Sequence, residues 1–261
     1  MKIFLLICVI LLIWGFFIEP QFIVKTKYRL KNTELSGEKI VFISDLHIAP
    51  WQHGRLKRIV KLINKQKPDL VLCSGDFVSG YIPSKTLPIE QIGKELSKID
   101  STHGFFAVLG NHDWWQNGAN IRNVLQNNGI KILENSSETI NINNKTISIA
   151  GIEDLQTRIP DTTKALKHTA ETTILLTHNP DPFFEIKENV FLTLAGHNHG
   201  GQVQIPFVGA LIVPSKSGTK YANGIFKNGN NTLIVTKGLG NSIMNIRFCC
   251  PPEIVIIEFE K

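Results

Sequence analysis

The sequence predicts an α/β fold attached to a membrane by its N-terminus, and three observations carry this expectation. In the first half of the chain, short apolar segments alternate with polar loops and amphipathic helical segments, as in βαβ units of a parallel sheet. The second half is richer in short strands. An almost uninterrupted apolar run covers residues 3–18. The chain has 261 residues, enough for one large α/β domain or two small ones.

The apolar run at the N-terminus predicts a membrane anchor over residues 1–24, followed by a catalytic domain over residues 25–261. The run is at the short end of a membrane span, which needs about 17–25 residues, and the apolar tail up to residue 24 brings it near that range. A cleaved signal peptide is the rival interpretation. The bulky residues Phe16–Ile18 stand where small residues would be needed for cleavage, so an uncleaved anchor is favoured.

The basic residues around the anchor predict its orientation. Four Lys or Arg residues lie within residues 25–31, against Lys2 before the run. This excess places the catalytic domain on the cytoplasmic side of a cell inner membrane, as a single-pass or peripheral protein. An extracytoplasmic domain stays open, because residues 22–31 also alternate apolar and basic side chains as a half-exposed strand does.

The overall composition is that of a folded protein with a mildly basic surface. There are 28 Lys and Arg against 22 Asp and Glu, a net charge of +6, with 43% hydrophobic residues. The charge suits a nucleic acid, an anionic membrane or a phosphorylated substrate. No concentrated basic tract follows residue 31, so nucleic acid is not expected as a partner. The cysteines Cys8, Cys73, Cys249 and Cys250 match neither a zinc spacing nor a disulfide framework.

The expected elements follow in order along the chain. Three apolar strands each run into a polar loop, and an amphipathic helix follows each of the first two. The expected strands cover residues 39–44, 69–74 and 104–109, and the expected helices cover residues 53–66 and 87–99. A hairpin at 139–143 and 145–150 opens the second half, with further strands at 173–176, 191–194, 202–205, 221–226, 232–236 and 253–259.

Residue types that ligate metals stand directly after five of these strands. Because the carboxyl ends of neighbouring strands meet at one edge of an α/β sheet, these side chains are expected to converge. Taken singly, an Asp here could form a turn, Asn111 could cap a helix, and His197 with His199 could lie on an exposed loop. The set comprises Asp45, His47, Asp76, Asn111, His112, His178, His197 and His199.

Such a set suits the hydrolysis of a phosphate ester. Two divalent ions about 3.5–4 Å apart neutralise the phosphate oxygens and lower the pKa of a bound water, which supplies a metal-bound hydroxide. A carboxylate is needed to bridge the ions, and imidazole, carboxylate or amide groups complete their coordination. The lack of thiolate ligands favours manganese first, with iron or zinc as alternatives, over a structural zinc.

In this order, the motifs Asp45-x-His47, Gly75-Asp76, Gly110-Asn111-His112-Asp113, His178 and Gly196-His197-x-His199 resemble those of the calcineurin-like metallophosphoesterase superfamily, from about Lys39 to the C-terminus. Residues 196–202 and 247–253 resemble its membrane-anchored bacterial branch. That branch includes phosphodiesterases and enzymes that cleave the pyrophosphate of UDP-2,3-diacylglucosamine in lipid A synthesis. The resemblance implies a four-layer αββα sandwich of two mixed sheets flanked by helices.

The resemblance also implies a role for each motif residue. His112 would contact a phosphoryl oxygen or protonate the leaving group, oriented by Asp113. Asn198 stands where many relatives of this branch have Thr, which is expected to change loop hydrogen bonds without loss of metal. Asp45, His47 and His199 would bind one metal, Asn111, His178 and His197 the other, and Asp76 would bridge them.

The substrate is less defined than the reaction. The anchor, aromatic residues in loops after the metal motifs and a basic helix face at 55–65 favour a membrane-associated, lipid-linked phosphate. The aromatic residues could equally complete a core. Two alternatives remain: a broad phosphodiesterase on soluble nucleotides, and a non-enzymatic scaffold with the same fold. The aromatic residues are Trp51, Tyr81, Trp114 and Trp115.

Overall fold

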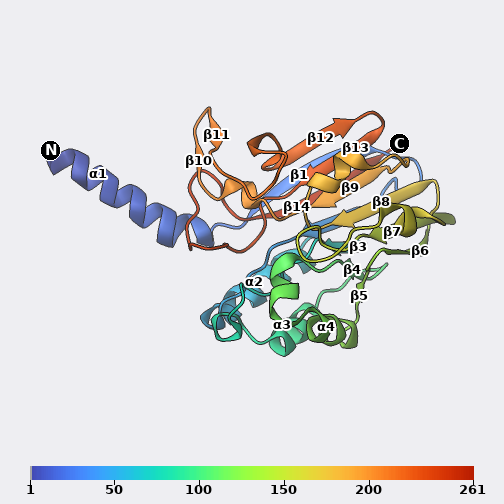
Figure 1. Cartoon of the computed structure of the whole chain (residues 1–261), viewed down its shortest axis with the longest axis horizontal. Helices are drawn as coiled ribbons and strands as arrows, with labels where there is room; N and C mark the ends of the chain where they lie inside the picture. The colour runs from blue at the N-terminus through green and yellow to red at the C-terminus, as the bar shows by residue number, and fades with distance from the viewer. Residues whose placement is uncertain (1) are drawn as a thin grey trace.

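The computed structural model describes residues 2–261 and consists of two facing six-stranded sheets with helices on their outer faces (Figure 1). The first sheet has the strand order β1-β14-β2-β3-β4-β5 and the second β12-β13-β9-β8-β7-β6. The first sheet contains β1 (Val24–Lys31), β2 (Lys39–Ile43), β3 (Leu70–Cys73), β4 (Phe105–Ala107), β5 (Ile130–Ile132) and β14 (Glu253–Glu260). The second contains β6 (Ser136–Ile142), β7 (Lys145–Gly151), β8 (Thr172–Thr177), β9 (Leu192–Ala195), β12 (Gly224–Asn228) and β13 (Asn231–Val235).

Both sheets are mixed, as expected. Strands β2 to β5 are parallel, and β14 runs antiparallel to β2 but parallel to β1. In the second sheet the outer strands β6 and β12 are antiparallel to their neighbours, while the four between them are parallel. The parallel strands of each sheet therefore bring their carboxyl ends to a common edge.

Three apolar clusters fill the spaces between four layers. Alternate residues of β2 point to opposite faces: Val41 packs against the helices and Phe42 against the second sheet. Helices α2 (His53–Asn64), α3 (Ile89–Leu96) and α4 (Asn111–Asn127) cover the first sheet (Figure 1). The short α5 (Thr162–Leu166) and a 3-10 turn at Asp181–Glu185 cover the second. The expected αββα sandwich is confirmed.

The N-terminal segment projects from this body as a helix (Figure 1). It consists of α1 (Lys2–Ile13), a π-helical turn at Trp14–Ile18 and a 3-10 turn at Glu19–Gln21. Over Lys2–Gln21 it has 20 residues and a mean hydropathy of 2.6, so it is long and apolar enough to cross a membrane. Its end is fixed to the body by the buried Glu19, which accepts hydrogen bonds from Cys249 N at 3.1 Å and Cys250 N at 2.6 Å.

Most expected strands and helices are present, with a few corrections. The strand expected at 202–205 is only β10 (Gln204–Ile205), which pairs with β11 (Gly209–Ala210), and the strand expected from residue 221 begins at Gly224. Strands β5 and β11 and helix α5 were not expected, and the helix that Asn111 could cap is α4, which begins at Asn111 itself. The basic side chains of β1 line its exposed face, where Lys27 and Arg29 lie near Glu258 of β14.

Candidate metal centre

Five strand ends bring the expected ligands to one edge of the sandwich. The first sheet contributes three loops, which follow β2, β3 and β4, and the second sheet contributes the loops after β8 and β9. The side chains meet where these two edges face each other, and all are buried. Together they are Asp45, His47, Asp76, Asn111, His178, His197 and His199.

The backbone of this edge is strained. Five of these residues lie in the left-handed region, with φ of 54° at Asp45, 42° at His47, 58° at Asp76, 67° at His197 and 49° at His199. Such conformations cost of the order of 1–3 kcal/mol each for residues with a Cβ. They persist because the loops are held by hydrogen bonds from neighbouring strand ends, such as Asp45 N to Gly75 O at 2.9 Å. The sharp turns aim successive side chains inward.

Two motif glycines are required by close approach. A Cβ at Gly110 would overlap the Asp76 carboxylate, and one at Gly196 would overlap the Ser44 hydroxyl and the Asp45 carboxylate. Both glycines therefore let two ligand-bearing loops touch. The motifs Gly110-Asn111-His112 and Gly196-His197 thus pair a glycine with a ligand for a steric reason.

One group of ligands is formed by Asp45, His47 and His199. His47 Nε2 lies 3.2 Å from His199 Nε2, and His199 Nε2 lies 3.5 Å from Asp45 Oδ1. On the other side of its ring, His47 Nδ1 lies 2.8 Å from the carbonyl oxygen of Val78. Donation of the Nδ1 proton to that carbonyl leaves a lone pair on Nε2, directed into the group.

A second group is formed by Asn111, His178 and His197. His178 Nε2 lies 2.9 Å from Asn111 Oδ1 and 3.2 Å from His197 Nδ1. His178 Nδ1 lies 2.7 Å from Ser74 O, which fixes this ring as Val78 fixes that of His47.

Asp76 lies between the two groups. Its Oδ2 is 3.3 Å from His47 Nε2 in the first group and 3.4 Å from His178 Nε2 in the second. Its Oδ1 accepts a hydrogen bond of 2.9 Å from the backbone N–H of His112. One carboxylate oxygen thus faces both groups, as a bridging ligand must.

The donor atoms fit two cations. With its Nδ1 proton directed to the Val78 carbonyl oxygen, His47 presents a bare Nε2 atom beside His199 Nε2. Asn111 Oδ1 beside His178 Nε2 offers a neutral oxygen donor in the second group. Imidazole, carboxylate and amide donors without thiolate suit manganese, iron or zinc in a hydrolytic site.

The protonation states of the buried histidines show that the negative charge of Asp76 needs a positive charge beside it. Burial lowers the pKa of His47 to about 3 and that of His197 to about 4, so both rings are neutral. Burial also opposes protonation of His178, but the charge of Asp76 outweighs it and raises the pKa of His178 to about 10. A proton on His178 or a cation beside it can each balance Asp76.

The residues that match a known family extend over most of the sandwich. Residues 38–201 match the calcineurin-like phosphoesterase family. The chain belongs to this family. It is 30% identical to the uncharacterized metallophosphoesterase YkuE of Bacillus subtilis, over 94% of this chain and 88% of the relative. The metallophosphoesterase is therefore a metal-dependent hydrolase with a candidate binuclear site.

Two further relatives have more specific names. The phosphodiesterase YaeI of Escherichia coli is 29% identical over 92% of this chain and 89% of its own. The UDP-2,3-diacylglucosamine pyrophosphatase LpxG of Chlamydia trachomatis is 27% identical over 94% of this chain and 92% of its own. A 5'-nucleotidase precursor from Thermus thermophilus shares the fold with a TM-score of 0.52 at 15% identity, over 77% of this chain. This chain spans about half of that structure, 49%.

His112 lies beside the first group of ligands. The His112 ring packs 4.6 Å from that of His47, and its Nδ1 accepts a hydrogen bond of 2.6 Å from Gly80 N. The role expected of Asp113 in orienting His112 stays a prediction. The buried carboxylate of Asp113 accepts hydrogen bonds from four backbone N–H groups, those of Asp76, Phe77, Val78 and Gly110. Asp113 thus fixes the loop that carries Asp76.

Several functional residues were not among the expected site residues. Arg247 is fully buried and donates to His199 O at 3.1 Å and to Cys250 O at 3.2 Å. A Cβ at Gly200 would lie 2.6 Å from Cys250 Sγ, so Cys250 packs directly under the loop of His199. Gln156 contacts His197 through its amide, 3.0 Å from Nε2. The contacts of Arg247 with His199 and of Gln156 with His197 join residues 48 and 41 positions apart in the sequence.

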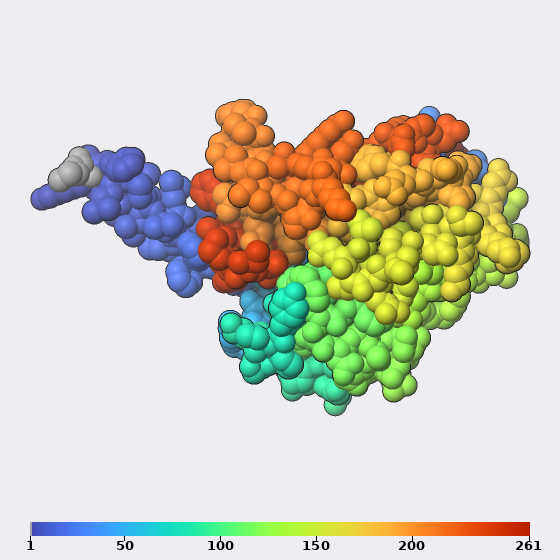
Figure 2. All heavy atoms as spheres, in the orientation of Figure 1, coloured from blue at the N-terminus to red at the C-terminus, as the bar shows by residue number. Residues whose placement is uncertain are grey.

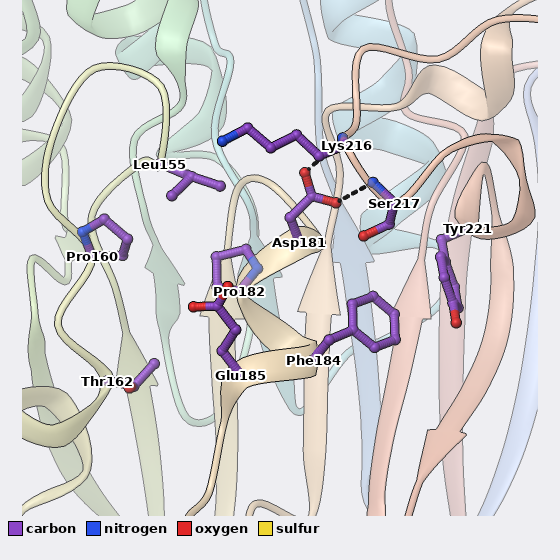
Figure 3. Close-up of a pocket in the computed structure, with 10 residues that line it drawn as sticks. All are labelled: Leu155, Pro160, Thr162, Asp181, Pro182, Phe184, Glu185, Lys216, Ser217 and Tyr221. Atoms are coloured by element: carbon purple, nitrogen blue, oxygen red, sulfur yellow. Dashed lines mark hydrogen bonds between the residues drawn. The ribbon is translucent and has the colours of Figure 1, made fainter.

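A pocket of about 470 Å³ lies among residues 155–162, 181–185 and 216–221 (Figure 3). None of the residues that line it is an expected ligand, but Gln156, within the first segment, and Pro214, two residues before the last, both contact His197. Asp181 lies at its centre and accepts hydrogen bonds from Lys216 N at 2.9 Å and Ser217 N at 3.1 Å.

The aromatic residues expected near the site divide into three kinds. Trp114 packs against the core and lies under the Arg158 guanidinium, so it is structural. Trp115 lies in α4 rather than in a loop, stacks on Tyr81 at 4.5 Å and packs 4.7 Å from the His112 ring. Trp51 is 82% exposed. Tyr81 and Trp115 thus form a stacked pair beside His112.

Proposed function

We propose that this metallophosphoesterase hydrolyses a phosphodiester or pyrophosphate bond of a membrane-associated, nucleotide-linked lipid such as UDP-2,3-diacylglucosamine, using two divalent cations with manganese as the first candidate. The placement of Asp76 Oδ2, 3.3 Å from His47 Nε2 and 3.4 Å from His178 Nε2, carries the two-cation part. The activity for which the relative LpxG is named supports the lipid substrate.

Two bound cations would neutralise the phosphate oxygens and lower the pKa of a water molecule. The remaining work falls to His112. Burial lowers the pKa of His112, which favours the neutral ring. Its Nδ1 accepts from Gly80 N, which places the ring proton on Nε2. A neutral ring donates a hydrogen bond far more readily than a proton, so we assign His112 to a phosphoryl oxygen rather than to leaving-group protonation.

The proposed location is the cytoplasmic face of a cell inner membrane. The helix Lys2–Gln21 supports attachment by its length and hydropathy. The basic residues after it support the orientation. Part of that basic excess also serves the sheet, because Lys27 lies 3.5 Å from Glu258 of β14.

A broad phosphodiesterase acting on soluble nucleotides is the second candidate. The name of the relative YaeI favours it. A non-enzymatic scaffold is disfavoured, because a scaffold needs neither the buried ligand set nor a directed His112 Nε2.

The deciding experiment is hydrolysis by the full chain in detergent with Mn²⁺ and with EDTA. The panel contains p-nitrophenyl phosphate, bis-p-nitrophenyl phosphate and UDP-2,3-diacylglucosamine. We expect Mn²⁺-dependent cleavage of the UDP-lipid with release of UMP, faster than that of either soluble ester. Preference for the soluble diester would move the proposal to the second candidate. A lack of Mn²⁺-dependent turnover on all three would overturn the enzymatic proposal.

A further inference from the structure

Two loops beside the anchor helix expose large apolar side chains. The tip of the β10–β11 hairpin exposes Phe207 and Val208, the residues just after β11 expose Leu211 and Ile212, and the loop 242–244 exposes Ile243 and Met244. These six residues are called the apolar loops below. Figure 2 shows the hairpin (orange) and the loop (red-orange) at the end of the body from which the helix (blue) projects. A cluster of this kind marks an interaction surface more often than chance.

The apolar loops hold their exposed side chains at a conformational cost. Phe207 has φ 68° and is 110% exposed, and Ile243 has φ 63° and is 102% exposed. In the hairpin, Val208 N donates to Ile205 O at 3.0 Å and closes a four-residue turn. Phe207 is the third residue of this turn, a position that normally takes glycine when φ is positive. A β-branched residue with positive φ is a clear outlier. Packing within the chain explains neither side chain.

Hydrogen bonds connect the residues just after the loop 242–244 to the anchor helix. Arg247 N donates to Gly15 O at 2.9 Å, and Asn245 Nδ2 to Phe16 O at 3.3 Å. A Cβ at Gly15 would lie 3.3 Å from Arg247 O, so the helix and the loop are in close contact. The exposed face of the loop is therefore continuous with the apolar surface of the helix.

The hairpin is connected to the same loop. The Gln202 side chain donates to Ser242 O at 3.0 Å and accepts from Ser242 N at 2.6 Å. The hairpin also packs on the loop that carries His199, since a Cβ at Gly201 would lie 2.7 Å from Ala210 Cβ. The apolar loops, the helix and the loop of His199 thus form one connected unit.

We propose that the apolar loops insert into the interface of the lipid bilayer that holds the anchor helix, and so fix the metal edge of the sandwich at the membrane surface. The bilayer is the occupant that the geometry favours, because the loops extend an apolar helix that is itself long enough to span one. Bulky apolar residues at loop tips suit an interfacial depth, where their backbones remain hydrated. The inference rests on the proposed membrane attachment but not on the substrate.

The test measures depth in the bilayer at single sites of the full chain. The accessible cysteines Cys8 and Cys249 are changed to serine, while Cys73 and Cys250 are buried. Bimane is then attached at Phe207→Cys or Ile243→Cys. The matched control is Asn230→Cys in the exposed β12–β13 turn, at the opposite edge of the sandwich. A further chain keeps Cys8 and carries only Cys249→Ser, so that bimane on Cys8 reports the depth of the helix itself in the bilayer.

Each labelled chain is reconstituted in nanodiscs of phosphatidylcholine and phosphatidylglycerol, with or without lipids brominated near the headgroup end of the acyl chain. We expect bromine to lower bimane emission at positions 207 and 243 at least about twofold and to leave position 230 unchanged. Phe207 and Ile243 are fully exposed, so neither change endangers the fold.

The outcomes separate this inference from the attachment of the helix. Quenching at Cys8 without quenching at 207 and 243 would overturn the insertion of the apolar loops and leave the anchor standing. Absence of quenching at Cys8 as well would overturn the attachment. Emission at 207 that depends on protein concentration but not on bromine would identify a contact between copies of the chain instead.

Discussion

Left-handed backbone conformations occur at both edges of the sandwich, but they serve different purposes. At the edge away from the metal centre, the β6–β7 turn places Asn143 and Asn144 at φ 52° and 60°, and the β12–β13 turn uses Gly229 at φ 57°. Asn and Gly tolerate this region well. At the metal edge the same region is occupied by ligands such as His197 and Asp76.

This difference separates folding requirements from functional ones. A turn at the far edge needs only to reverse the chain, so its residues follow local conformational preference. The metal edge places charged and aromatic residues in conformations that they disfavour, and buries them. Strain that local sequence does not relieve is typical of a site maintained for chemistry. Changes at the metal edge should therefore affect activity, and changes at the far edge only stability.

The largest expected effect is that of Asp76→Ala. The change removes the oxygen that faces both ligand groups, while the loop remains held by the Asp113 carboxylate. We expect loss of bound metal and a fall in kcat/KM of at least about a thousandfold, or about 4 kcal/mol of transition-state stabilisation. Metal content by elemental analysis and turnover of bis-p-nitrophenyl phosphate check this. Undiminished turnover would sink the two-cation mechanism.

Next in size is His112→Ala, which tests the assignment of a donor that is not a ligand. Metal content should stay at the wild-type value, while kcat falls about 100- to 1000-fold, as when one donor to a developing charge is removed. His112→Gln, which keeps an N–H donor, should recover part of the loss. A variant that loses metal would show that His112 is a ligand.

A smaller effect is expected at Gln156, which contacts His197 from outside the ligand set. Gln156→Leu removes a polar partner of the ligand and should weaken metal binding about tenfold, at the low end for such positions. Gln156→Glu should restore it, because a carboxylate accepts the His197 Nε2 proton. Titration with Mn²⁺ measures both. Equal affinity in all three chains would show that Pro214 O alone orients the ring.

The sequence predicts the ligands better than the groups that position them. Each ligand follows a strand directly, and β1 follows a strict alternation over Val24–Lys31. Arg247 and Glu19, by contrast, act through partners 48 and 231 residues away, at His199 and Cys250. Local pattern carries no signal for such contacts.

The local sequence pattern also could not predict the shortest elements or the roles of individual residues. Strand β5 has three residues, Ile130–Ile132, too few to show a period. Asp113 follows His112 directly, but its carboxylate bonds to backbone N–H groups of residues 76–78. Only the packing of α4 against the loop after β3 reveals this. The sequence predicts which residues meet, and the three-dimensional contacts decide what each one does.

The smallest effect is expected at the far edge, from Asn144→Gly. Asn143 and Asn144 connect β6 to β7 with positive φ at both positions, as a type I′ turn requires, and Asn-Gly is the preferred pair there. Glycine removes the steric cost of φ 60° in the folded state but increases the conformational entropy of the unfolded chain. We expect the first effect to be slightly larger, so the free energy of unfolding should rise by about 0.5 kcal/mol. Urea unfolding of the full chain in detergent measures this, and kcat/KM should not change. Altered turnover would mean that the far edge is coupled to the metal centre, and the separation of the two edges would fail.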